Sequence, residues 1–249
     1  MEAMSHQYRA ECQLELIRRK RKKKLEGSFK SFIEYFFPFT EGCDFIFKEH
    51  HEIIIEVLEA VVRQDKERVI INIPPGYGKT EIVVVMFSAW CYAIQPRCRN
   101  LHLSYSDALV NSNSVKVKNI INLKEYQDLW PMEWDKSQAG KEHWKTQEGG
   151  EFRAVSTSGG VTGFRAGRMQ DGFYGAILFD DPIKPEDAES SIKRDAKNAL
   201  VSSTVKSRLM KESTPIVLIM QRLHDDDTTG FLLEGGSGAD WIVTGKHLY

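Results

Sequence analysis

The stretch that decides the fold runs from residue 68 to residue 80 and reads Arg-Val-Ile-Ile-Asn-Ile-Pro-Pro-Gly-Tyr-Gly-Lys-Thr. Its first half is a short, β-branched apolar run, which predicts a buried strand that ends at the two prolines. Residues 80–94 are apolar nearly all round. Their length and their place directly after the loop favour a buried helix over a further strand. The sequence therefore predicts a strand, a glycine-containing loop and a helix in succession.

This loop contains the groups that bind a phosphate. Gly76 and Gly78 allow the backbone angles that aim N–H groups at an anion, and the following helix points its positive end at the same place. We expect Lys79 to reach the β- and γ-phosphates of ATP and Thr80 to place its hydroxyl on Mg²⁺. The full phosphate-loop pattern has glycine where Ile73 stands, so the strict motif fails. A Gly-Lys-Thr sequence between a strand and a helix still indicates a phosphate-binding loop.

A second signature follows at residues 176–181, Ala-Ile-Leu-Phe-Asp-Asp. It is an apolar strand that ends in two carboxylates, and on its own such a pair can also cap a turn or a helix. Together with the loop it predicts an ATP-hydrolysing site, in which Asp180 supports Mg²⁺ and Asp181 orients the attacking water. Glu186 is an alternative to Asp181, because aspartate is one methylene shorter than the glutamate usual at this position. Gln221 ends a further apolar strand and is a candidate sensor of the γ-phosphate.

Arginines that could compensate charge on the γ-phosphate are Arg165 and Arg168, in a glycine-rich segment that is also readable as a mobile surface loop. Basic side chains gather at residues 18–24 and again at residues 193–211. Either group could contact DNA phosphates, and either could simply be a solvated face.

The rest of the chain alternates strand and helix patterns. Further strands are expected at 100–105, 152–156, 175–180 and 215–221, with helices at 51–63, 107–123 and 190–209. This alternation predicts an α/β fold with a mainly parallel central sheet and helices on both faces. An aromatic-rich segment at residues 29–47 is expected to pack on the core, and some of its rings could flank an adenine.

Composition sets the remaining limits. The 249 residues are 41% hydrophobic and 28% charged with a net charge of −1, so overall charge does not indicate a nucleic-acid partner. The four cysteines have no zinc-like spacing, and we interpret them as free thiols in a reducing compartment. Neither an apolar run of membrane-spanning length nor a signal-peptide core is present. A cytosolic protein without a membrane partner is expected.

These motifs, in this order, resemble the ATPase domain of the large terminase subunit of tailed bacteriophages, a DNA-packaging motor. The resemblance covers roughly residues 45–249. It rests on His50-His51, the Pro-Pro-x-x-Gly-Lys-Thr loop with Glu81, Leu103-Ser104-Tyr105-Ser106, Trp144-Lys145-Thr146, residues 159–163, Asp180-Asp181-Pro182-Ile183-Lys184, Ala188-Glu189-Ser190 and residues 221–227.

The resemblance implies a P-loop NTPase of the additional-strand (ASCE) type at residues 45–249, preceded by an N-terminal arm at 1–44. The residues expected to hold ATP are Pro75, Gly76, Tyr77, Gly78, Lys79, Thr80, Glu81 and Gln221, with Thr80 and Asp180 on Mg²⁺ and with Lys79, Asp181, Arg165 and Arg168 in catalysis. Relatives often carry arginine inside the loop, where this chain has Gly76 or Tyr77. Arg165 or Arg168 is therefore expected instead, acting either in its own subunit or in the site of a neighbour.

The resemblance also implies double-stranded DNA, a portal protein and a small terminase subunit as partners. A homo-oligomeric ring, five-membered in the family, would assemble on the procapsid portal in the host cytoplasm. The family's nuclease domain would not fit before Tyr249, and we expect it on another chain or removed. Two other functions stay open: a helicase-like DNA translocase, and a non-catalytic protein that uses ATP to gate assembly.

Overall fold

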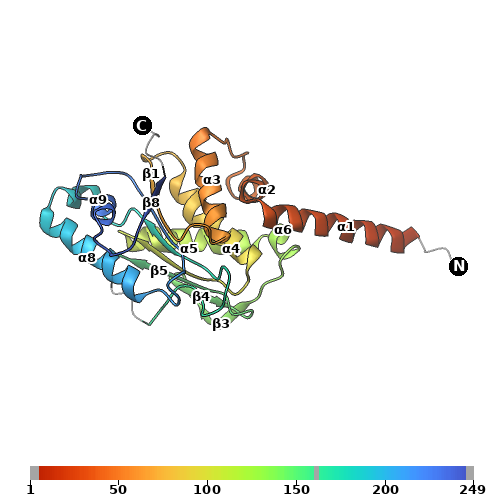
Figure 1. The fold of residues 1–249 in the computed structure, drawn as a ribbon. Coiled ribbons are helices and arrows are strands. Elements are labelled where there is room, and N and C mark those ends of the chain that lie inside the picture. The colour runs from red at the N-terminus through yellow and green to blue at the C-terminus, as the bar shows by residue number, and fades with distance from the viewer. Residues whose placement is uncertain (1–5, 160–162, 245–249) are drawn as a thin grey trace.

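The computed structural model describes residues 6–159 and 163–244, which contain an eight-stranded sheet (Figure 1). In spatial order its strands are β3 (Trp134–Ala139), β4 (His143–Thr146), β5 (Glu151–Ser156), β2 (Arg99–Ser104), β6 (Ile177–Asp180), β7 (Ile216–Met220), β1 (Arg68–Asn72) and β8 (Ile242–Thr244). The six strands from β5 to β8 are parallel, whereas β4 pairs antiparallel with β5 and with β3. All carboxyl ends of the parallel strands therefore meet at one edge of the sheet, which is the usual place for a ligand.

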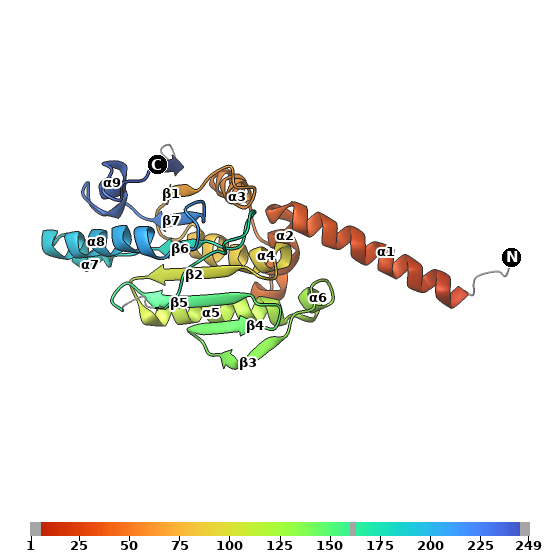
Figure 2. The ribbon, with the colours of Figure 1, turned by 60° about the horizontal axis from the view of Figure 1, so that its bottom comes forward.

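Helices cover both faces of the sheet (Figure 2). They are α1 (His6–Gly27), α2 (Phe29–Glu41), α3 (Glu49–Val62), the π-helix η1 (Glu81–Met86), α4 (Phe87–Ile94), α5 (Asp107–Asn122), α6 (Lys124–Gln127), α7 (Pro185–Ala188), α8 (Ser191–Ser207) and α9 (Thr228–Leu233). One core cluster joins α2, α3, η1, α4 and α5 to one face, and a second joins α8 and α9 to the other. No helix in the described part of the chain is long and apolar enough to cross a membrane.

The aromatic-rich segment belongs to the main core, as its composition predicts. Phe29, Phe32 and Phe36 of α2 are fully buried, and Phe29 stacks on Trp90 of α4 with ring centroids 4.9 Å apart. The Trp90 indole also donates a 2.9 Å hydrogen bond to the carbonyl of Leu25 in α1. These contacts hold α2 and the end of α1 against the sheet domain, while the rest of α1 projects away from it (Figure 1).

The predicted α/β fold with a mainly parallel sheet is confirmed, and three features differ from expectation. The strands β3 and β4 extend the sheet in the antiparallel direction, with Trp144 of β4 buried against Phe152 at 5.2 Å between centroids. The short strand β8 was not expected. The helix after the loop begins as η1, whose Val83-Val84-Val85 core places three β-branched side chains in one turn, where they crowd an α-helix. The division of the chain at residue 44 stays a prediction.

Candidate nucleotide-binding site

The glycine-flanked loop follows the carboxyl end of β1. Gly76 and Gly78 have φ of +85° and +70°, in the left-handed region that side chains disfavour. Pro75 and the loop backbone up to Gly78 are exposed, whereas the side chain of Lys79 is buried. The loop residues Pro75 to Gly78 are thus open to solvent, whereas the lysine that follows them points inward.

The loop and the acidic strand end converge, although a hundred residues separate them in sequence. The Thr80 hydroxyl donates a 2.8 Å hydrogen bond to Asp180 Oδ2. The Lys79 ammonium forms an ion pair with Asp181 Oδ2. These contacts are possible because β6 lies two strands from β1, with β7 between them, and all three are parallel.

Asp181 is held in an uncommon backbone conformation. Its φ is +43°, which costs a non-glycine residue of order 1 kcal/mol and persists only where the surrounding contacts offset that cost. The backbone N–H of Asp181 donates to the carbonyl of Ile219, and its Oδ1 accepts a 3.1 Å hydrogen bond from the N–H of Gln221. Asp181 therefore connects the acidic strand end, the loop lysine and the end of β7, where it contacts the backbone of Gln221.

The electrostatics of Asp180 are unusual. Its side chain is buried, and this burial, reinforced by the charge of Asp181, raises the pKa of Asp180 to about 7. The hydrogen bond from Thr80 and the charge of Lys79 oppose that increase only in part. A carboxylate in this environment is poorly stabilised without a further cation.

The oxygen atoms of this site suit a hard cation that a bound ligand would also help to coordinate. Asp180 Oδ1 is buried and accepts no hydrogen bond from any described residue. Within residues 6–159 and 163–244, no three His, Cys, Asp or Glu side chains are grouped so that they could hold a metal ion by themselves. Mg²⁺ is commonly bound by one or two protein groups, with phosphate oxygens and water completing its octahedron. The hydroxyl of Thr80 and the carboxylate of Asp180 suit that arrangement.

A histidine anchors the loop from α3. The backbone N–H of Lys48 donates to His51 Nδ1 at 3.1 Å, and His51 Nε2 lies 3.1 Å from the carbonyl oxygen of Tyr77. The first contact requires an unprotonated Nδ1, so Nε2 carries the proton and can donate to the loop. Burial lowers the pKa of His51, which favours this neutral form. The resemblance had drawn attention to the pair His50-His51, but its spacing gave no sign of this contact.

Beside the loop lies a pocket of about 450 Å³, a volume within the range of small-molecule sites. Aromatic rings of Phe37, Phe45, His50, His51 and Tyr77 line it, together with the backbone of Gly76 and Gly78. An apolar pocket next to an anion-binding loop suits a flat base carried on a phosphate chain. The side chain of Glu81 is directed elsewhere, because it forms a 2.8 Å ion pair with Lys116 of α5.

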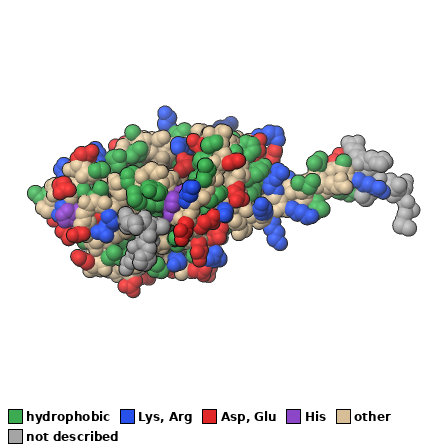
Figure 3. Space-filling view, turned by 90° about the horizontal axis from the view of Figure 1, so that it is seen from above, with side chains coloured by type: hydrophobic (Ala, Val, Ile, Leu, Met, Phe, Trp, Pro, Cys, Tyr) green, Lys and Arg blue, Asp and Glu red, His purple; other side chains and the backbone are tan. Residues whose placement is uncertain are grey.

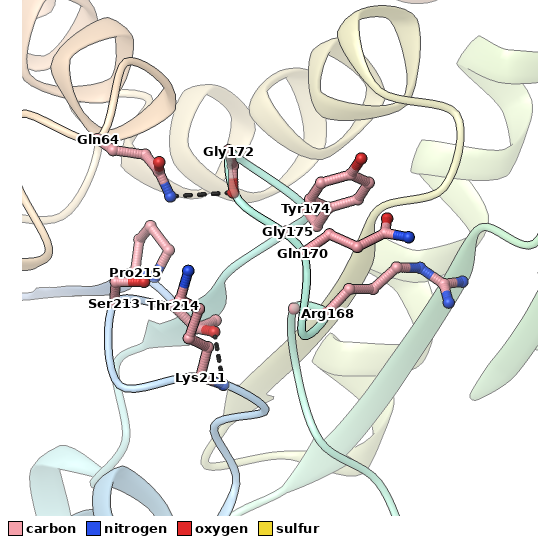
Figure 4. Close-up of a pocket in the computed structure, with 11 residues that line it drawn as sticks. Gln64, Arg168, Gln170, Gly172, Tyr174, Gly175, Lys211, Ser213, Thr214 and Pro215 are labelled. Atoms are coloured by element: carbon pink, nitrogen blue, oxygen red, sulfur yellow. Dashed lines mark hydrogen bonds between the residues drawn. The ribbon is translucent and has the colours of Figure 1, made fainter.

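The two candidate arginines are not brought to the loop within one chain. Arg168 donates to the carbonyls of Arg97 and Gly149, which precede β2 and β5. Figure 4 shows Arg168 extending away from a pocket at this amino edge of the sheet, where Thr214 and Gly175 precede β7 and β6. The loop lies at the opposite edge, about 20 Å away for strands of six residues. Arg165 is exposed, and part of its glycine-rich segment, residues 160–162, lies outside the described residues.

That segment is less of a surface loop than its composition suggests. Phe164 and Ala166 are buried in the second core cluster, and the Arg99 guanidinium lies 4.9 Å from the centre of the Phe164 ring. The other alternative site residue, Glu186, is exposed on α7.

The motif at residues 221–227 is built around a buried aspartate. Asp227 is fully buried and accepts hydrogen bonds from Arg222 Nε at 2.9 Å and from the N–H of Gly230 at 3.1 Å, the second as the N-cap of α9. Its neighbours Asp225 and Asp226 are exposed. Asp227 is thus a structural helix cap, and an aspartate directly before the short run that forms α9 was the available signal for it. Arg194 is also buried, so the basic face expected on α8 lacks it.

The fold and the site define a mixed α/β protein with a mostly parallel sheet and a candidate phosphate-binding site at its carboxyl edge. Neither a family model nor a curated protein matches the chain. Among solved structures, the large terminase of bacteriophage HK97 is similar in fold, with a TM-score of 0.52 and 15% sequence identity. The match covers 86% of this chain and 41% of that terminase. The chain therefore has a terminase-like fold and spans less than half the length of that protein.

Proposed function

We propose that this chain is the ATPase motor domain of a phage large terminase, which hydrolyses ATP to move double-stranded DNA into a procapsid. The observation that carries the proposal is the convergence of Thr80 with Asp180 and of Lys79 with Asp181. The strand order supports a P-loop NTPase of the additional-strand type, since β7 stands between the loop strand and the acidic strand. The fold similarity to the HK97 large terminase supports the packaging role.

In this proposal the protein groups that bind MgATP are in place before the nucleotide arrives. The loop amides and Lys79 take the β- and γ-phosphates, and the aromatic pocket beside Tyr77 takes the adenine. Thr80 and Asp180 would hold Mg²⁺, whose chemistry there would be to neutralise charge on the phosphate oxygens. Lys79 then exchanges its partner Asp181 for phosphate. That exchange frees the carboxylate of Asp181 to orient a water molecule.

The charge-compensating arginine is assigned to a neighbouring subunit. Arg165 is the better candidate because it is exposed, whereas Arg168 is held by two backbone carbonyls. Such an arrangement requires the ring, five-membered in the family, that the resemblance implies. Gln221 would transmit loss of the γ-phosphate from Asp181 to the end of β7, through the hydrogen bond that joins them.

The partners follow from the same proposal. Double-stranded DNA, a portal protein and a small terminase subunit would meet the ring in the host cytoplasm. Lys and Arg side chains gather along the projecting helix α1, as Figure 3 shows, and this supports a role of the arm in binding an acidic partner. The exposed basic residues of α8 are the second candidate surface for a DNA backbone.

Phosphate release with and without duplex DNA tests the proposal against its two alternatives. A packaging motor is expected to hydrolyse ATP in a way that duplex DNA stimulates, without separating strands. Strand separation would favour a helicase-like translocase, and nucleotide binding without turnover in the assembled ring would favour an ATP-gated assembly protein. A Lys79→Ala variant with near-normal turnover would refute the site itself. Lys116→Ala, which removes another lysine of an ion pair, is the matched control.

A further inference from the structure

Three neighbouring parallel strands end in polar side chains at the edge that carries the loop. Ser156 ends β5, Ser104 ends β2 and Asp180 ends β6. Ser104 is the register partner of both Ser156 and Asp180, so the three residues form one row across the sheet. Register partners in parallel strands point to the same face, and Asp180 contacts Thr80 on that face. The row therefore continues the proposed metal site away from the loop.

The two serines have an unusual combination of burial and missing partners. Ser104 and Ser156 are each 1% exposed. Neither hydroxyl has a hydrogen-bond partner among the described residues, and the same is true of Asp180 Oδ1. A buried polar group without a partner costs about 1–3 kcal/mol, so three in one row call for a missing partner that they share.

Two water molecules, one between Ser156 and Ser104 and one between Ser104 and Asp180, would satisfy all of these groups. Adjacent strands lie about 4.8 Å apart, and two hydrogen bonds through one water span up to about 5.5 Å. A hydroxyl can donate to the water, which in turn donates to the acceptor Oδ1 of Asp180. The carboxylate would then be fixed from both sides, by Thr80 at Oδ2 and by the serine-held water at Oδ1.

We propose that Ser104 and Ser156 are positioning residues that hold ordered water against Asp180 Oδ1 and so orient this carboxylate toward Mg²⁺. The inference rests on the proposed function, because it extends the metal site of the MgATP complex. Groups that orient a metal ligand typically change metal affinity by about 10–100-fold when removed. The serines act through Asp180 and do not contact the reacting atoms.

The test compares Ser104→Ala and Ser156→Ala with Ser88→Ala. Ser88 of α4 is the matched control, since its hydroxyl is also fully buried and lacks a partner within the described ranges. Binding of a fluorescent ATP analogue is titrated with Mg²⁺ and is measured separately in EDTA. Melting of each variant in EDTA reports on the fold.

We expect Ser104→Ala to raise the Mg²⁺ concentration required for tight nucleotide binding by about 10-fold. Binding in EDTA should stay unchanged, and the metal-free melting temperature should change little, because the hydroxyl is bonded to water and no protein group loses a direct partner. Combining Ser104→Ala with Ser156→Ala should add less than the sum of the single effects if both hydroxyls hold one chain of water that ends on Asp180.

The possible results distinguish a failure of the proposed role of the serines from a failure of the proposed function. A wild-type protein whose nucleotide binding ignores Mg²⁺ would overturn both. Normal Mg²⁺ dependence in the wild type together with a Ser104→Ala variant that behaves like Ser88→Ala would overturn the inference alone. A Ser104→Ala variant that melts earlier in EDTA with unchanged Mg²⁺ dependence would assign the row a purely structural role, and would also overturn it.

Discussion

Replacing Asp180 with asparagine should stabilise the fold while it abolishes the proposed activity. The pKa of this carboxyl rises from 3.8 to about 7 on folding, mainly because it is buried. The folded state therefore binds the proton more tightly than the unfolded state between these two values. Stability contributed by the protonated form is fully present below pH 3.8 and is lost as the pH rises through about 7. Above pH 7 the folded protein has lost the whole of this contribution to its free energy of unfolding.

The size of this effect follows from the two pKa values. Their difference corresponds to about 4 kcal/mol at most, and the coupling of Asp180 to Asp181 makes this an upper bound. In a chain of this length, each kcal/mol moves the melting temperature by about 2–4 °C. Asp180→Asn is thus expected to melt about 5–10 °C above the wild type at pH 8 in EDTA, and close to it at pH 4.

The assay is thermal melting of both proteins in EDTA across this pH range, with MgATP added in a parallel series. Asp171→Asn, which removes a fully exposed carboxylate, is the control and should not raise the melting temperature. MgATP should stabilise the wild type more than Asp180→Asn, because the variant lacks a ligand of the metal. If the two proteins keep the same melting temperature difference at pH 4 and pH 8, the buried charge assigned to Asp180 is wrong.

Three further predictions concern the site and the core. Lys79→Ala should lower ATP turnover by at least about 100-fold with the fold intact, as circular dichroism would check, since the ammonium stabilises charge on the transferring group. Asp181→Asn should keep nucleotide affinity but lose about 100-fold or more in single-turnover hydrolysis, and undiminished hydrolysis would exclude Asp181 as the water-orienting group. Burial lowers the pKa of His102 to about 4, so its neutral form stabilises the fold above pH 6.5, and about 3 kcal/mol should be lost as the pH falls to 4. Urea unfolding of His102→Asn should show a correspondingly smaller acid loss, and an unchanged acid loss would show that His102 does not titrate in this way.

Much of the sheet could be predicted because its strands are continuous apolar runs between breakers. The run at residues 216–220 is buried at every position, as a central parallel strand requires. The antiparallel strand β4 could not be predicted in the same way, since Trp144 is its only apolar residue and is buried by contacts with Phe152. The pattern of residues within a short strand does not show which other strand it pairs with.

The loop half of the site was predictable, whereas its support was not. Gly76 and Gly78 are needed because the backbone has a positive φ at both positions, and glycines are visible directly in the sequence. The contact of Lys79 with Asp181 depends on how strands far apart in the chain are ordered, and only the motif pair suggested it. His51 and Ser104 gained their places through packing and register, which leave no trace in residue spacing.

The central claim is that the loop lysine and the twin aspartates share one magnesium-bound triphosphate. A crystal structure of the protein with Mg²⁺ and a non-hydrolysable ATP analogue tests it most directly. The account predicts that Lys79 leaves Asp181 and contacts the phosphates, with the metal between the Thr80 hydroxyl and Asp180. A nucleotide bound elsewhere, with the pair of Lys79 and Asp181 intact, would contradict it.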